Sequence, residues 1–496
     1  MPSSSMLVLL GFATGLILWL LDRPDREYRM ESDTFFIYLL APIIFDAGYF
    51  MPNRSFFASI ITILIFAVGI TIWNTIAIGV TLSLLPSLLP SLSLVPLLLF
   101  SSLLSASDPV AVIAVFDEIH INDFLFVHVF GEALFNDAIA VVIFNLLLTM
   151  YNRGIRDLLI SGHVLGSLTA AFVFNALASV VLGVVFVVLS SLLSRLSVRD
   201  NSAGAVFIYI IPYLSFLLAY ALNLSPIITI AVCGMGMRRY VEANLPKKNG
   251  ETMRQFTKTV SHASEAVVYL FLGLAAFSSK ANWRLLFSLS SSSLFILFSL
   301  LLTFLSRWIL LFPLCALLNL LGTSEKKLTM KDQLLLSFSA LRGAIAFALA
   351  ASLPNQMGEK SLFITATLLI VYFNVFVQGC SIGRLVDRLG VECKERGDSV
   401  ETVVEIRASS RCDSPGGLYS FFERFSSNYL DRLLINEGRK GKWTGKYEMT
   451  ARAEIAIQTK RGGEEVNSIA EEASKIVQKR LNSLKDEIEE VEFATV

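Results

Sequence analysis

Long apolar stretches separated by short polar breaks fill the chain from its first residues to about residue 385. Most stretches approach the roughly 20 apolar residues that a helix needs to cross the hydrocarbon core of a bilayer. The pattern predicts an all-α polytopic membrane protein with about twelve spans. Their ranges are 5–21, 34–51, 56–82, 93–116, 124–150, 163–193, 203–222, 225–237, 259–278, 285–320, 333–353 and 361–384.

The composition agrees with a protein built for lipid. Hydrophobic residues make up 54% of the chain and charged residues 17%, with a mean hydropathy of +0.64. No basic run or zinc-type spacing of Cys and His is present, and the five cysteines are scattered. These features argue against a nucleic-acid-binding protein, a metalloenzyme or a disulfide scaffold. We therefore expect a protein that is not an enzyme and carries no resident cofactor.

The chain divides into two parts by charge. Residues 1–385 form the predicted transmembrane domain, and residues 386–496 form a charged cytosolic tail. Apolar residues between Leu418 and Leu434 recur at helical spacing. Such a segment either packs on another helix or the membrane face, or binds a partner protein.

Basic residues favour an orientation with both termini in the cytoplasm. In that orientation the inner loops carry more Lys and Arg than the outer loops. The inner residues are Arg54, Arg195, Arg199, Arg238, Arg239, Lys247, Lys248, Arg254, Lys258, Lys326, Lys327 and Lys331.

The fourth predicted span contains Ser107, Asp108 and Pro109. A proline interrupts the hydrogen bonds of a helix, and an interrupted helix presents carbonyls and dipole ends to an ion. Asp108 either takes part in ion binding or caps the second half-helix; the two roles are compatible.

The fifth span contains Glu132, Asn136 and Asp137 deep in apolar sequence. Their hard oxygen atoms suit a small cation such as sodium, and a carboxylate removed from water can hold a proton instead. One site at Asp137 can then serve either ion. The alternative is that these groups only bond to neighbouring helices.

Arg342 in the eleventh span requires an anion, because a charged side chain is costly within lipid. Glu132 is the expected partner, which leaves Asp137 to exchange one proton for one cation without net charge movement. Asp46 and Glu265 lie near the ends of other spans, where they are accessory ion-site candidates or local capping and pairing groups.

These residues resemble the animal-type sodium/proton exchangers, the electroneutral branch of the monovalent cation:proton antiporters. The similar segments are 42–49, 107–112, 130–132, 136–138, 240–244, 264–265, 341–345 and 376–379. The resemblance implies two inverted repeats of six helices around a linker helix, a homodimer, and two crossed discontinuous helices, here the fourth and eleventh spans. It also implies that Asp137 binds the ion and the proton beside Asn136, and that Glu132 pairs with Arg342. An EF-hand calcium-binding partner is implied on the tail, for which the segment 418–434 is the candidate.

Three departures from the family stand out. Twelve spans are predicted where the family has thirteen, so the first family helix is apparently lacking. Ala133 stands where the family commonly has Ser, and Ala41 where it usually has Pro. The first substitution bears on ion preference and the second on inhibitor sensitivity.

The sequence thus predicts electroneutral exchange of sodium for protons, regulating cytosolic or organellar pH and sodium, with the plasma membrane favoured as the location. The alternatives are a potassium/proton exchanger of the same fold and a non-transporting membrane scaffold or sensor. A cation channel is disfavoured because the sequence has no filter motif.

Overall fold

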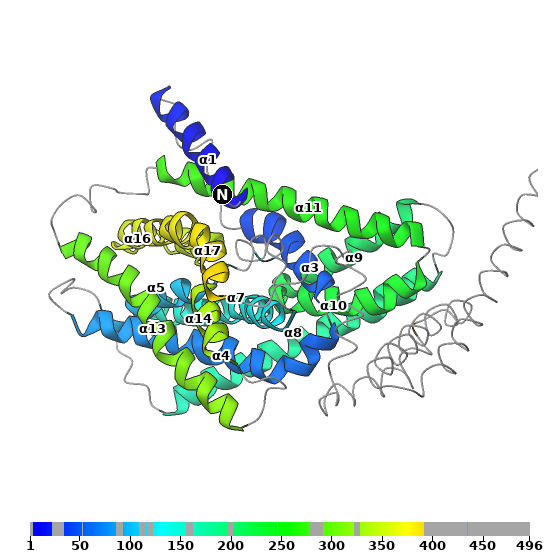
Figure 1. Cartoon of the computed structure of the whole chain (residues 1–496), viewed down its shortest axis with the longest axis horizontal. Coiled ribbons are helices and arrows are strands. Elements are labelled where there is room, and N and C mark those ends of the chain that lie inside the picture. The colour runs from blue at the N-terminus through cyan, green and yellow to red at the C-terminus, as the bar shows by residue number, and fades with distance from the viewer. Residues whose placement is uncertain are drawn as a thin grey trace, which may run out of the picture.

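The computed structural model describes residues 3–21, 34–51, 53–85, 93–108, 116, 123–154, 162–196, 202–245, 247–277, 291–321, 328–390 and 434. Every regular element within these ranges is helical (Figure 1). Six of the described helices are long and apolar enough to cross a bilayer, and shorter apolar helices accompany them. The predicted all-helical architecture is therefore confirmed.

The helices form two groups, whose members pack mainly on one another. The first group, bundle A, holds both interrupted spans and the helix with Asp137. Its helices are α4 (Asn53–Ser83), α5 (Leu94–Ser105), α7 (Asp123–Asn152), α13 (Ser291–Leu321), α14 (Met330–Phe338), α15 (Ala344–Ser352), α16 (Lys360–Phe373), the π-helix η4 (Asn374–Gly379) and α17 (Cys380–Leu389).

The second group, bundle B, lies beside bundle A, with α11 running along its edge (Figure 1). Its helices are α1 (Ser3–Leu20), the π-helix η2 (Phe35–Leu40), α3 (Ala41–Phe50), α8 (Gly162–Leu196), α9 (Ser202–Ala221), α10 (Pro226–Asn244), α11 (Lys247–Leu274) and the short helix η3 (Ala275–Phe277).

Glycines bring the helices of bundle B into backbone contact. A Cβ atom on Gly11 of α1 would lie 2.2 Å from the carbonyl oxygen of Leu270 on α11, and one on Gly48 of α3 would lie 2.6 Å from the carbonyl oxygen of Ala231 on α10. Small residues at such crossings are typical of helix packing in lipid, where close backbone approach supplies the attraction.

The boundaries of two spans differ from the prediction. Helix α10 continues past residue 237 to Asn244, and α11 begins at Lys247 instead of 259. The added turns carry charged side chains that pair with each other: Arg254 of α11 forms a salt bridge with Glu242 of α10. A search for apolar runs misses these turns because they are charged. They remain helical because the salt bridge pairs their charges within the protein.

Both predicted interruptions are present. Helix α5 ends at Ser105, just before Asp108, and α14 ends at Phe338, with α15 starting five residues beyond Ser339 at Ala344. The intervening residues 339–343 are not helical. The eleventh span is thus broken where Arg342 lies, and the helix of the fourth span ends before Asp108, beyond which Pro109 and the residues to 115 lie outside the described residues.

Candidate ion-binding site

The two interruptions meet through their backbones. The amide of Asp108 donates to the carbonyl of Leu341 at 2.6 Å. The guanidinium Nη1 of Arg342 donates to the carbonyls of Ser105 at 2.7 Å and Ala106 at 3.2 Å. The last carbonyls of a helix lack partners within it and attract a cation. Arg342 therefore caps α5 and fastens the two broken helices together.

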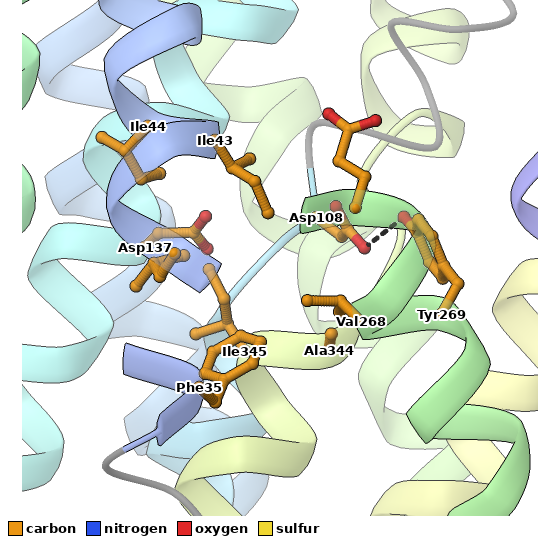
Figure 2. Close-up of a pocket in the computed structure, with 11 residues that line it drawn as sticks. Phe35, Ile43, Ile44, Asp108, Asp137, Val268, Tyr269, Ala344 and Ile345 are labelled. Carbon is orange, nitrogen blue, oxygen red and sulfur yellow. Dashed lines mark hydrogen bonds between the residues drawn. The ribbon is translucent and has the colours of Figure 1, made fainter. Parts of the chain in front are cut away.

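Gly343 permits the approach of Asp108 to the second broken helix. A Cβ atom at Gly343 would lie 1.8 Å from Oδ2 of Asp108, which is impossible without displacement. The same Oδ2 accepts a hydrogen bond of 2.9 Å from the hydroxyl of Tyr269 on α11 (Figure 2). Asp108 is thus positioned by bundle A and hydrogen-bonded to bundle B.

Asn136 and Asp137 lie on α7, and both are 0% exposed. Neither side chain has a hydrogen-bond partner of ordinary geometry among the described residues, although the backbone of Ser107 approaches the Asp137 carboxylate. The charged groups near Asp137 are Asp108 and Arg342. Because buried polar atoms are nearly always hydrogen-bonded, these oxygens are available for an ion, a proton or water.

A cavity of about 30 Å³ reaches this carboxylate between the bundles. Asp108 and Asp137 supply carboxylates to its wall, and the Tyr269 hydroxyl beside Asp108 donates to it (Figure 2). Its lining also includes Glu265. The remaining lining residues are apolar: Phe35, Leu40, Ile43, Ile44, Val268, Ala344 and Ile345. Ser107 and Asn136 adjoin Asp108 and Asp137 in sequence but are not part of the lining. A narrow cavity with three carboxylates, a tyrosine hydroxyl and otherwise apolar walls suits a small cation freed of most of its water.

The predicted pairing of Glu132 with Arg342 is wrong. Both carboxylate oxygens of Glu132 accept from Arg307 of α13, at 2.6 and 3.0 Å. Arg342 lies near enough to Glu132 for electrostatic interaction, but its hydrogen bonds go to the carbonyls at the end of α5. The prediction assigned a carboxylate as the negative partner of Arg342. In the structure this partner is the C-terminal end of α5, which carries a partial negative charge.

Arg307 is the residue that the sequence analysis missed. It lies within the apolar span of α13, is 4% exposed, and also donates to the carbonyl of Leu336 at 2.9 Å. A lone arginine in such a span is itself a signal, because it requires a buried anion. Two arginines and one nearby glutamate left the pairing undetermined in the linear sequence.

The two accessory candidates lie close together in bundle B. Glu265 of α11 lines the cavity and interacts electrostatically with Asp46 of α3 and with Asp108. Its Oε2 also lies 3.4 Å from Nδ1 of His262. Asp46 is half-buried and is not a lining residue. Glu265 therefore lines the cavity itself. Asp46 is connected to the cavity only by its electrostatic interaction with Glu265.

Two crossed, interrupted helices beside an unpartnered buried carboxylate, in a protein of many apolar helices, define a membrane carrier for ions. The family model described as "Sodium/hydrogen exchanger, transmembrane" matches residues 1–388. The chain belongs to this family, which confirms the resemblance, and it is a multi-pass membrane protein.

Individual relatives support the assignment. The chain is 37% identical over 499 residues to "Probable Na(+)/H(+) antiporter nhx-9" of Caenorhabditis elegans, an alignment that covers 98% of this chain and 72% of the nematode protein. It is 37% identical over 400 residues to human "Sodium/hydrogen exchanger 3", covering 79% of this chain and 46% of the human protein.

The fold also matches a solved structure. The sodium proton antiporter MjNhaP1 from Methanocaldococcus jannaschii superposes with a TM-score of 0.59 at 18% identity, covering 79% of this chain and 93% of the archaeal chain. The predicted antiporter fold with two crossed discontinuous helices is therefore confirmed.

Proposed function

We propose that this chain is a secondary antiporter that exchanges sodium ions for protons, and that Asp137 binds both. The observation that carries this proposal is the carboxylate of Asp137, fully buried, without a hydrogen-bond partner among the described residues, and in the wall of a cavity between two bundles. A carboxylate in this state binds a cation or a proton, and the relatives, which are named as sodium/proton exchangers, indicate the pair of ions.

The chemistry of exchange follows from the competition of two monovalent ions for one group. Asp108, Asn136 and the interrupted backbone at Ser107 are the nearby sources of oxygen ligands for sodium. Because Glu132 is already paired with Arg307, it does not contribute a second variable charge. The site carries the same charge with sodium bound as with a proton bound, so exchange is one for one and electroneutral.

The setting of this activity is part of the proposal. The excess of Lys and Arg in the predicted inner loops supports cytoplasmic termini, with residues 1–385 in the membrane and residues 386–496 as a regulatory tail. The plasma membrane is the proposed location, where exchange would regulate cytosolic pH and sodium. We further propose a homodimer and an EF-hand partner on the segment 418–434, most of which lies outside the described residues.

The direct test is recovery of cytosolic pH after an acid load in cells that lack their own exchangers. The wild-type chain is compared with Asp137→Asn. This substitution keeps the size of the side chain but removes the negative charge that binds a cation or a proton. Asp387→Asn serves as the matched control, because Asp387 is an exposed carboxylate on α17 of the same bundle. We expect sodium-dependent recovery that Asp137→Asn abolishes and Asp387→Asn preserves.

Other outcomes would redirect the proposal. Recovery driven by potassium and not by sodium or lithium would establish a potassium/proton exchanger on the same carboxylate. Absence of recovery with a correctly inserted protein would favour a non-transporting scaffold or sensor. Recovery that persists in Asp137→Asn would refute the role of this residue.

A further inference from the structure

One residue of the charged tail lies within the membrane domain. Leu434 is 1% exposed, and its side chain belongs to the main cluster of buried apolar residues. It lies far beyond the end of α17 at Leu389, in the region predicted to be cytosolic. A leucine is buried to this extent only where the surrounding helices provide a seat for it.

The backbone of Leu434 is also held, by two hydrogen bonds to its carbonyl. Its carbonyl accepts from Nδ2 of Asn244 at 2.8 Å and from the hydroxyl of Ser191 at 3.1 Å. Two donors match the two lone pairs of one carbonyl oxygen. Both donors are themselves buried, at 1% exposure for Asn244 and 0% for Ser191.

Helices α8 and α10 together build this seat. The amide of Asn244 also donates to the carbonyl of Ser191 at 3.3 Å and to the hydroxyl of Ser194 at 3.1 Å. Ser191 and Ser194 lie in the last two turns of α8, and Asn244 is the last residue of α10. The seat is therefore a feature of the ends of two bundle B helices.

The position of the seat relates the tail to both bundles. The tail leaves the membrane domain from α17, which belongs to bundle A, whereas Leu434 is held by α8 and α10 of bundle B. The same end of α10 contacts α3: Nη1 of Arg238 donates to the carbonyl of Phe50 at 2.8 Å. Helix α3 in turn lines the cavity with Ile43 and Ile44.

We propose that the tail of this chain docks on bundle B at the seat formed by Ser191, Ser194 and Asn244, through Leu434, so that the tail, which begins after α17 of bundle A, is also held on bundle B. The occupant is the chain's own tail, because Leu434 fills the seat with both its side chain and its carbonyl. The proposal stands independently of which ion is transported.

Cysteine cross-linking in the full chain tests the docking. Cysteines are placed at Ser191 and Leu434 in a chain whose five native cysteines are replaced by serine, and membranes are treated with a short bis-maleimide. The control pair joins Leu434→Cys to Ser179→Cys, since Ser179 is an equally buried serine in the middle of α8, about 18 Å along the helix from Ser191. We expect an intramolecular product for the first pair that exceeds the control at least tenfold.

The hydrogen bonds of the seat are tested in the chain with its native cysteines. Asn244→Leu keeps the volume but removes the amide that donates to Leu434, and trypsin cleavage after Arg432 and Arg439 reports release of the tail. Asn175→Leu is the control, because Nδ2 of Asn175 also donates to a backbone carbonyl, that of Asn223, but from the middle part of α8, away from the seat. We expect several-fold faster cleavage in Asn244→Leu and the parental rate in Asn175→Leu.

Equal cross-linking of the two cysteine pairs, or equal cleavage of the two leucine variants, would overturn the proposal. A product that joins two chains instead of one would also overturn it, because the seat would then hold the tail of a second copy. Failure of sodium/proton exchange would leave these outcomes unchanged, since neither readout depends on transport.

Discussion

Bundles A and B bury polar groups in different ways. Bundle A contains Glu132, Arg307 and Arg342 and leaves the side chains of Asn136 and Asp137 without hydrogen-bond partners among the described residues. Bundle B joins its helices at glycine crossings such as Gly11 against Gly273. Of its charged contacts, that of Arg254 with Glu242 lies near helix ends, and that of Glu265 with His262 lies beside the cavity.

The difference indicates a division of labour. Buried ionisable groups are costly in lipid and are kept where they bind or pair with something, as in bundle A. Tight backbone contacts give rigidity with few polar atoms, as in bundle B. Since the cavity takes Asp108 and Asp137 from bundle A, and Glu265 and most of its apolar wall from bundle B, it requires both bundles.

The largest expected effect concerns the buried ion pair of bundle A. Arg307→Gln leaves Glu132 charged and unpaired in a buried position, which typically costs about 3–5 kcal/mol. We expect loss of folded protein, measured by thermal melting of the purified chain in detergent. Glu132→Gln combined with Arg307→Gln should restore most of the melting temperature.

The matched double variant joins Glu132→Gln to Arg342→Gln. Because Arg342 donates to the carbonyls of Ser105 and Ala106, its coupling to Glu132 should be smaller than that of Arg307. A larger coupling for Arg342 would reinstate the pairing predicted from the sequence.

A second large effect is expected at the crossing of the broken helices. Gly343→Ala places a methyl group against the Asp108 carboxylate, and overpacking of this kind costs about 1–3 kcal/mol. We expect at least a tenfold loss of sodium-dependent pH recovery. Gly358→Ala is the control, because a Cβ atom there meets nothing within 4 Å. Equal activity of the two variants would show that Asp108 does not need its observed position.

A glycine crossing of bundle B should affect stability more than ion binding. A Cβ atom on Gly273 would lie 2.3 Å from the carbonyl oxygen of Val8, so Gly273→Ala forces α1 away from α11 at a cost of about 1–3 kcal/mol. We expect a lower melting temperature with an unchanged KM for sodium. Gly69→Ala, which would contact only Leu314 at 3.9 Å, should change neither. A raised KM with normal stability would contradict the division between the bundles.

The smallest effect is expected where the bundles touch. Tyr269→Phe removes the 2.9 Å hydrogen bond to Asp108, worth on the order of 1 kcal/mol. We expect transport to fall about fivefold in flux assays at matched expression. Tyr372→Phe is the comparison, since its hydroxyl donates to the carbonyl of Leu272 away from the carboxylates. Tyr372→Phe should lower stability without lowering transport per folded molecule.

Much of this arrangement could be predicted from the sequence, because lipid imposes simple requirements. Apolar runs located most spans, Asp108 with Pro109 predicted the interruption of the fourth span, and the family resemblance implied that of the eleventh. Asp137 was selected as a candidate because a carboxylate is costly in lipid. Contacts between distant helices could not be predicted. Arg307 and Tyr269 lie in spans far from their partners, and only the packing of the helices decides which anion each one reaches.

The central claim is that one carboxylate, Asp137, binds either sodium or a proton. Its most direct test is calorimetry of sodium binding to the purified chain in two buffers of different ionisation enthalpy, which gives the number of protons released per sodium bound. The account predicts release of one proton per sodium when the measurement is made at a pH where the site is protonated, and no sodium binding by Asp137→Asn. Sodium binding without proton release at any pH, or unchanged binding by Asp137→Asn, would contradict it.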